Sequence, residues 1–200
     1  MGGGGFVSAV VASKVEQGLI YARTDVGGAY RWNEAEKRWV SITDWLGPDY
    51  MGLMGVDAIA LDPSNPSRIY MLAGTTYWND GKTMILRSDD YGDTWDTINV
   101  TSQFKTNGNG MGRQNGERLA VDPNNPNILF AGTRNDGLWK STDRGSTWSK
   151  VAGAPTLAND LGICMVLFDK NKTASGATSR IYIGYSRDAD NLYVSDNGGT

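Results

Sequence analysis

The sequence predicts an all-β protein made of repeated four-stranded units, and three observations support this prediction. First, the pattern Ser-x-Asp-x-Gly-x-Thr-Trp occurs at residues 88–95 and 141–148, and residues 195–200 begin it again with Asn in place of Asp. Second, the element Asp-Pro-x-Asn-Pro precedes the first two copies, at residues 62–66 and 122–126. Third, the segments between these motifs are short apolar runs bounded by Gly, Asn, Asp and Pro, which is typical of strands and turns.

The unit around the second copy shows the strand pattern most clearly. We expect its four strands at residues 118–121, 128–132, 138–140 and 148–151. No segment of the chain has a sustained helical period. Four antiparallel strands repeated about every 50 residues are typical of the blades of a β-propeller.

The repeat also sets the expected organisation of the chain. The expected blades are residues 6–45, 46–101, 102–152 and 153–200, of which the first is a degenerate copy and the last is incomplete. A propeller closes with about four to eight blades. We therefore expect a partial β-propeller, a fragment of a longer protein with an open sheet edge.

The Ser-x-Asp-x-Gly-x-Thr-Trp pattern, here called the Asp box, has a structural explanation. Its Asp can accept hydrogen bonds from backbone N–H groups across the turn between the third and fourth strands, and its Gly permits a positive φ. Its Trp is expected to pack between neighbouring blades. We therefore interpret the box as a staple of the fold without a catalytic role.

Composition excludes several classes of function. The 19 basic and 22 acidic residues give a net charge of -3 without a basic run, which argues against nucleic acid or a membrane surface as a partner. No stretch approaches the ~20 apolar residues of a membrane span, and residues 6–12 are too short for the core of a signal peptide. The chain has no histidine and one cysteine, which argues against a zinc hydrolase, a Ser-His-Asp triad and an internal disulfide. We expect neither a metal nor a cofactor.

The order of antiparallel strands separates two rims. The Asp-Pro turns and Asp boxes lie on one rim, and the loops that vary between units lie on the other, where binding and catalysis usually reside. Asp25 is expected at a loop tip on this variable rim, within a segment that contains Gly27 and Gly28. A turn-capping role is the alternative for Asp25. Asp57 and Glu117 each lie five residues before the Asp of the Asp-Pro element, and we expect them at the channel mouth, in contact with substrate or buried in hydrogen bonds to neighbouring loops.

Aromatic side chains share the variable rim with these carboxylates. They are Trp45, Tyr50, Tyr77 and Trp78. Aromatic planes stack on the C–H faces of sugar rings, so the combination indicates a polysaccharide cleft, with packing between blades as the alternative. The Gly-rich and Asn-rich residues 107–112 are expected to form a mobile loop tip rather than a sugar contact.

Two segments together with the Asp boxes resemble glycoside hydrolase family 74, the xyloglucanases. They are Thr24-Asp25-Val26-Gly27-Gly28-Ala29-Tyr30-Arg31-Trp32 and the segment from Arg113 to Pro123. The resemblance covers essentially the whole chain. It implies two seven-bladed propellers with a cleft between them, and endo-type hydrolysis of the β-1,4-glucan backbone of xyloglucan with inversion. It also implies that Asp25 is the catalytic base, and that the acid is an aspartate of a missing C-terminal propeller.

The resemblance leaves alternatives open. Enzymes of the family are several times longer, so we expect the 200-residue piece to be inactive by itself. Met1 and the glycines after it suggest an added start or a removed signal, in keeping with a secreted parent protein. A non-catalytic Asp-box propeller that binds a glycan or a protein is the alternative function. A sialidase is a weaker third interpretation, because the arginines are scattered along the sequence.

Overall fold

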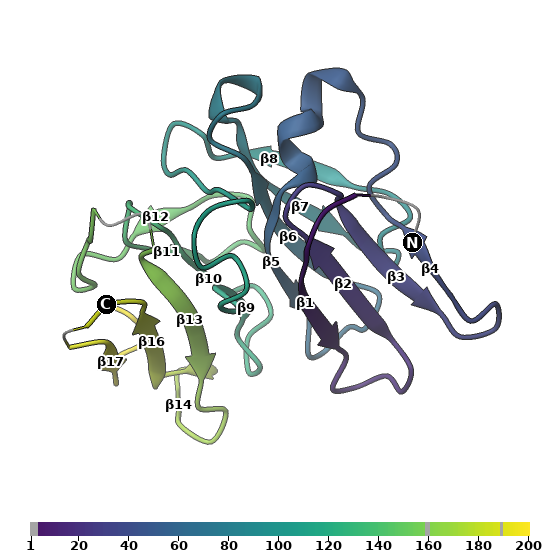
Figure 1. Cartoon of the computed structure of the whole chain (residues 1–200). Coiled ribbons are helices and arrows are strands. Elements are labelled where there is room, and N and C mark those ends of the chain that lie inside the picture. The colour runs from purple at the N-terminus through teal and green to yellow at the C-terminus, as the bar shows by residue number, and fades with distance from the viewer. Residues whose placement is uncertain (1–3, 159–160, 189) are drawn as a thin grey trace.

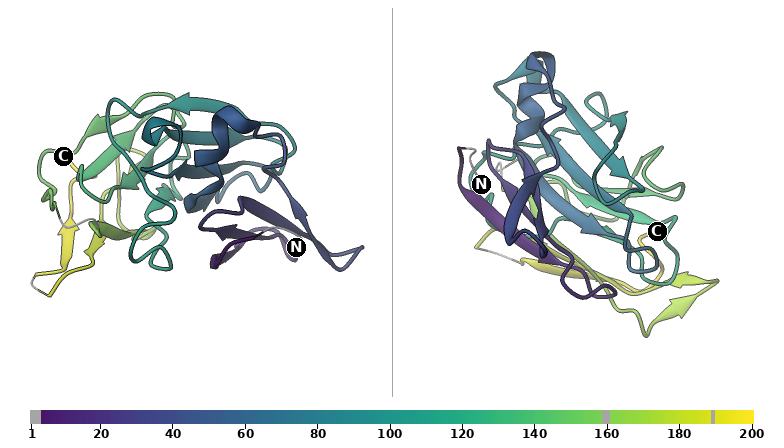
Figure 2. Two further views of the ribbon diagram at one scale, coloured as in Figure 1. Left: turned by 45° about the horizontal axis from the view of Figure 1, so that its top comes forward. Right: turned by 90° about the vertical axis from the view of Figure 1, so that its right-hand side faces the viewer.

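Four β-sheets, besides one two-stranded hairpin, follow one another along an arc in the computed structural model, which describes residues 4–158, 161–188 and 190–200. The expected start at Met1 thus lies outside the described residues. Each sheet is antiparallel, and each of the first three is built from four consecutive strands, so the predicted all-β repeat is confirmed (Figures 1 and 2). The first sheet contains β1 (Val7–Ala12), β2 (Ile20–Thr24), β3 (Ala29–Asn33) and β4 (Arg38–Ser41). The second contains β5 (Val56–Leu61), β6 (Ile69–Gly74), β7 (Thr83–Ser88) and β8 (Asp96–Asn99).

The third sheet agrees with the strands expected from the sequence to within a few residues. It contains β9 (Leu119–Val121), β10 (Leu129–Gly132), β11 (Leu138–Ser141) and β12 (Ser149–Lys150). The fourth sheet contains β13 (Ile163–Phe168), β16 (Ile181–Tyr185) and β17 (Leu192–Ser195). The hairpin of β14 (Thr173–Ala174) and β15 (Ala177–Thr178) replaces the Asp-Pro turn in this last unit. It packs back onto the third unit, because the Thr178 N–H donates to Asp122 Oδ2 at 2.8 Å.

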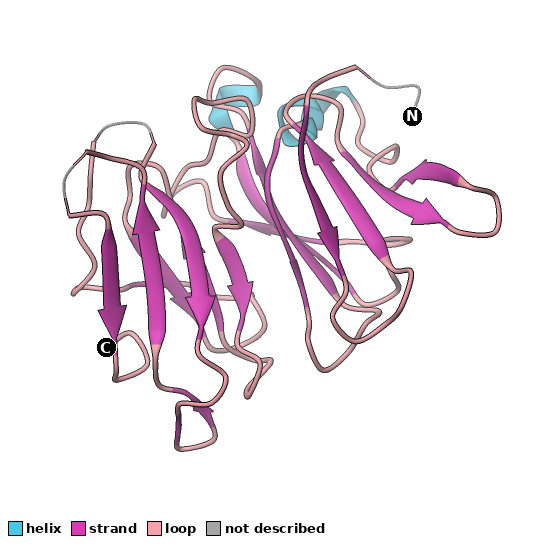
Figure 3. Ribbon diagram, turned by 60° about the horizontal axis from the view of Figure 1, so that its bottom comes forward, coloured by secondary structure: helices cyan, strands magenta, loops and turns pink. Residues whose placement is uncertain are grey.

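Two short 3-10 helices were not predicted, because neither is long enough to show a helical period. They are η1 (Pro48–Met54), between the first and second sheets, and η2 (Asn79–Gly81), between β6 and β7. Both lie at the same end of the sheets, on the variable rim (Figure 3). No helix among the described residues is long and apolar enough to cross a membrane.

Alternating side chains of the second sheet fill the spaces on both of its faces. Ile69 and Met71 of β6 pack toward the first sheet, and Tyr70 and Leu72 of the same strand pack toward the third. All four are fully buried. Since side chains alternate along a strand, a strand buried on both faces must be apolar at every position. A third apolar cluster joins the third and fourth sheets, so each pair of neighbouring sheets shares its own core.

The Asp boxes form the turns that the sequence predicted. Asp90 Oδ1 accepts the Thr94 N–H at 2.8 Å, and Asp143 Oδ1 accepts the Thr147 N–H at the same distance. The box tryptophans Trp95 and Trp148 pack into the cores between sheets. The structural role assigned to the box is thus supported by both complete copies.

The box carboxylates should give the fold an acid-sensitive component. Hydrogen bonds from the Thr94 side chain and backbone lower the pKa of Asp90 to about 2, whereas an unfolded Asp has a pKa of about 3.9. Because the folded pKa is the lower one, the stabilisation is complete above pH ~4 and is lost as the pH falls toward ~2. We predict that Asp90→Asn is less stable than the parent at pH 7, and that this difference shrinks between pH ~4 and ~2. Urea unfolding across this range tests the prediction, with the exposed Asp44→Asn as control, and a difference that does not change with pH would contradict it.

Candidate functional site

Loops from three successive strand connections pack together on the variable rim. The Gly28 N–H donates to the Met54 carbonyl at 2.8 Å, which joins the β2–β3 loop to the end of η1. The Gly52 N–H of η1 donates to Asn79 Oδ1 of η2 at 2.7 Å. Thr75 Oγ1 donates to the Gly52 carbonyl at 3.0 Å. The loop that contains Asp25 is therefore held against the two helices that lie among the rim aromatics.

The β2–β3 loop is a tight turn that fixes the position of Asp25. Thr24 Oγ1 donates to the Gly28 carbonyl at 2.8 Å and accepts the Gly27 N–H at 2.7 Å. Gly28 has a φ of +76°, which a residue with a Cβ rarely adopts. Asp25 thus occupies the first corner of a four-residue turn.

Asp25 is more buried than the sequence indicated. Only 8% of its side chain is exposed, because the N-terminal segment before β1 folds over the turn. The Phe6 N–H donates to Asp25 Oδ1 at 2.7 Å, and the Asp25 N–H donates to the Phe6 carbonyl at 3.1 Å. Asp25 Oδ2 forms an ion pair with Arg113 Nε at 3.0 Å. Asp25 therefore lies in the expected loop between β2 and β3, but its side chain does not project freely, because the contacts that cover it come from segments outside its own loop.

Glu117 accepts hydrogen bonds from two other units. Its Oε1 accepts from Arg23 Nε at 2.8 Å, and its Oε2 accepts the Ile59 N–H at 2.6 Å. Burial raises the pKa of Glu117, while Arg23 and the Ile59 N–H oppose this by stabilising the ionised carboxylate. Of the two roles considered for Glu117, this placement favours the internal hydrogen-bonded one.

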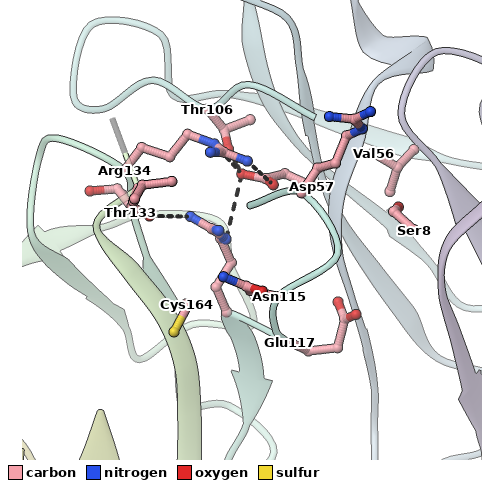
Figure 4. Close-up of polar contacts among 12 residues, drawn as sticks. Ser8, Val56, Asp57, Thr106, Asn115, Glu117, Thr133, Arg134 and Cys164 are labelled. Atoms are coloured by element: carbon pink, nitrogen blue, oxygen red, sulfur yellow. Dashed lines mark hydrogen bonds and ion pairs between the residues drawn. The ribbon is translucent and has the colours of Figure 1, made fainter. Parts of the chain in front are cut away.

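Asp57 is the centre of a buried group of charges (Figure 4). Its Oδ1 pairs with Arg134 Nη2 at 2.9 Å, and its Oδ2 lies 3.6 Å from Arg118 Nε and accepts from Thr106 Oγ1 at 2.5 Å. The two guanidinium groups and the hydrogen bonds lower the pKa of Asp57 against the opposing effect of burial. Asp57 is 0% exposed, so its carboxylate acts between blades rather than on the rim surface.

Asp57 and Glu117 belong to a series of four equivalent positions. The other members are Ser8 in β1 and Cys164 in β13. The pairing of β1, β5 and β13 with the next strand is interrupted at Ser8, Asp57 and Cys164, so each is the extra residue of a bulge. Bulges change the direction of a side chain. Ser8 was missed by sequence reasoning, although it accepts from Arg23 Nη1 at 2.8 Å. Ser8 lies five residues before Ser13, the first residue after β1, just as Asp57 lies five residues before Asp62, the first residue after β5. This shared spacing could have identified Ser8 from the sequence.

The four rim aromatics are partly exposed rather than enclosed between blades. The exposed fractions are 44% for Trp45, 39% for Tyr50, 57% for Tyr77 and 41% for Trp78. The rings of Tyr77 and Trp78 lie 5.6 Å apart, tilted by 55°. Their exposure leaves ring surface free for a ligand, which is the condition that sugar stacking requires.

Residues 107–112 do not form the mobile tip that their composition suggested. The Gly108 N–H donates to the Gly74 carbonyl at 2.7 Å, and a Cβ on Gly108 would lie 2.3 Å from the backbone of Gly55. Asn109 Nδ2 donates to Tyr77 Oη at 2.6 Å. The glycines of this loop therefore permit one backbone to pack closely on another, and Asn109 orients the rim aromatic Tyr77.

A metal site has no support in the part of the chain that the structure describes. No group of three His, Cys, Asp or Glu residues there could hold an ion. Asp25, Asp57 and Glu117 are instead paired with arginines, which bind carboxylates through several N–H donors.

Asp57→Ala should strongly destabilise the fold. The substitution leaves Arg118 and Arg134 buried without their counter-ion, and breaking a buried pair in this way costs about 3–5 kcal/mol. The control is Asp89→Ala, because Asp89 pairs with Arg68 at the surface and its side chain is 57% exposed. Chemical denaturation measures both. Equal free energies of unfolding for the two variants would contradict the assigned role.

Gly28→Ala and Gly18→Ala form a matched pair that separates backbone strain from crowding. Both glycines have a positive φ, but a Cβ at Gly28 would lie 2.0 Å from Thr43 Oγ1, whereas a Cβ at Gly18 has no atom within 4 Å. We expect Gly18→Ala to cost about 1–2 kcal/mol through its backbone conformation. Gly28→Ala should cost about 1–3 kcal/mol more through overpacking. Thermal unfolding compares them, and equal losses would show that Thr43 moves aside freely.

Comparison with known proteins places this rim in context. No family model matches the chain. A xyloglucanase of a Paenibacillus species is 46% identical over 213 residues, covering 98% of this chain and 20% of its own length. The crystal structure of the GH74 enzyme of Niastella koreensis has a TM-score of 0.94 and 52% identity, and it matches 100% of this chain and 29% of that one. The GH74 xyloglucanase of Xanthomonas campestris has a TM-score of 0.91 and 44% identity, with 99% of this chain and 30% of that one covered.

The chain thus spans about a fifth to a third of the length of these relatives. The likeness extends over every unit of the repeat. It agrees with the two segments that first indicated the family. By sequence and by fold, the chain belongs to glycoside hydrolase family 74, of whose proteins it represents one segment.

Proposed function

We propose that the chain is the part of a xyloglucan-hydrolysing enzyme that supplies the catalytic base, Asp25. The observation that carries the proposal is the connection of Asp25 to the aromatic rim. Its loop is hydrogen-bonded to η1 through Gly28 and Met54, and η1 is hydrogen-bonded to η2, which adjoins Tyr77 and Trp78. A carboxylate and a surface for stacking sugars thus belong to one rigid set of loops.

The low exposure of Asp25 suits a base that acts through water. In an inverting glycosidase the base activates a water molecule, and the two carboxyl groups lie about 6.5–9.5 Å apart to leave room for it. Such a base needs to contact only a water molecule and one face of the sugar ring. A carboxylate with 8% of its side chain exposed, held in place from two sides, meets this requirement.

The proposal requires that the general acid lies outside this segment. Asp57 is buried between two arginines, and Glu117 is held by Arg23 and the Ile59 N–H, so neither carboxyl is free to reach a leaving group on the rim. A second propeller of the same protein is the proposed source of the acid, and the relatives are long enough to contain one. The proposed substrate is the β-1,4-glucan backbone of xyloglucan, which the enzyme cleaves at internal bonds. We propose that the enzyme is secreted and so reaches this polysaccharide. Trp45, Tyr50, Tyr77 and Trp78 are the proposed stacking residues.

The experiment that tests the proposal is Asp25→Ala in the longer protein that contains this segment. We expect kcat on xyloglucan to fall by about 10²–10⁴-fold, the usual contribution of a general base. Asp44→Ala, an exposed carboxylate after β4, is the control and should retain turnover. Circular dichroism verifies that both variants fold.

Two other outcomes discriminate among the alternatives. Turnover by Asp25→Ala within a few-fold of the parent would remove Asp25 from the mechanism. Binding of xyloglucan oligosaccharides without any turnover by the parent would favour the non-catalytic, glycan-binding interpretation. Release of products only from chain ends would keep the chemistry and change the mode of cleavage.

A further inference from the structure

Arg113 joins Asp25 to the interior of the molecule. Its side chain pairs with Asp25 Oδ2 at 3.0 Å, and its backbone carbonyl accepts from Arg23 Nη1 at 2.9 Å. The Arg113 guanidinium also lies over the Phe6 ring, 5.4 Å from the centroid, and Phe6 is the residue whose N–H binds Asp25 Oδ1. Arg113 thus contacts both Asp25 and the segment that covers it.

Arg23 is a rigid support for the backbone of Arg113. It is 0% exposed, and its guanidinium binds Glu117 Oε1 at 2.8 Å and Ser8 Oγ at 2.8 Å. Glu117 is fixed in turn by the Ile59 N–H at 2.6 Å (Figure 4 shows Glu117 and Ser8 among these groups). These contacts come from the first three units of the repeat. The position of Arg113 is therefore set by the packing of three blades rather than by its own loop alone.

The contact between Arg113 and Asp25 has a geometry that suits a working base. The Arg113 Nε–H is buried and makes no hydrogen bond, although Nε lies 3.0 Å from the carboxylate. The contact therefore orients Asp25 through charge and does not occupy a lone pair of Oδ2 with an aligned N–H. Because a carboxylate oxygen has two lone pairs, Oδ2 can still accept a hydrogen bond from a water molecule.

We infer that Arg113 is a positioning residue that holds the Asp25 carboxylate toward the water it activates. This inference rests on the proposed function. Glu117 and Arg23 act one step further away, because they place the backbone of Arg113. Contact with substrate was one of the two roles considered for Glu117, and the geometry assigns it this indirect role instead.

The test compares three variants in the longer protein: Arg113→Ala, Asp25→Ala and the control Arg87→Ala. Arg87 is matched to Arg113 because it also pairs with a carboxylate, that of Asp96, and 21% of its side chain is exposed, against 33% for Arg113. We expect Arg113→Ala to lower kcat on xyloglucan by about 10²-fold, the cost of about 1 Å of misplacement, while KM changes little. Arg87→Ala should keep the parent kcat. Low millimolar guanidinium should restore part of the kcat of Arg113→Ala and none of that of Asp25→Ala.

The outcomes separate this inference from the proposed function. If Asp25→Ala is inactive but Arg113→Ala keeps a kcat within twofold of the parent, the positioning role is refuted and the base stands. The positioning role would also be refuted, in favour of a structural one, if guanidinium does not restore kcat and the melting temperature of Arg113→Ala is well below that of the parent. If Asp25→Ala is active, the proposed function and the positioning role of Arg113 are both refuted. Arg113→Lys provides a second check, because it keeps the charge without the guanidinium geometry and should recover only part of the kcat.

Discussion

Pairing of buried arginines with carboxylates is the constraint on which the rim of this molecule depends. Arg23, Arg118 and Arg134 are among the largest fully buried side chains. Removing a guanidinium from water costs several kcal/mol unless a counter-ion and hydrogen bonds replace the lost hydration. Asp57 and Glu117 provide these, and each belongs to one unit of the repeat and pairs with an arginine of another. The charges therefore join neighbouring units at this rim, in addition to the apolar cores between their sheets.

Glycine supplies the second requirement, which is close approach of one loop to another. Gly28 lies against Thr43, and Gly108 lies against the backbone of Gly55. These contacts leave no space for a side chain, so these loops of the variable rim pack closely against their neighbours. A set of loops of this kind can keep a carboxylate and several aromatic rings at fixed separations. This is the preorganisation on which catalysis by positioning depends.

The chemistry proposed for the rim follows from this rigidity. A base that works on water gains from a fixed orientation and loses little from limited exposure. The Phe6 N–H and the Arg113 guanidinium fix the two oxygens of Asp25 from opposite segments of the chain. Division of the base and the acid between two domains of one protein would let the spacing of the domains set the distance between the two carboxyls.

Local sequence determined the repeat, the strands and the Asp-box turns. Each depends on residues a few positions apart, such as Asp90 and Thr94, or on the alternation of side chains along one strand. The exposure of the rim aromatics was one of two alternatives that the sequence left open. The burial of Asp25, the arginine partners of Asp57 and Glu117, and the packing of residues 107–112 were decided only by tertiary structure. Arg134 lies 77 residues from Asp57, and Glu117 lies 94 residues from Arg23. No periodicity or turn preference joins residues that far apart, because the contacts exist only after the blades have packed side by side.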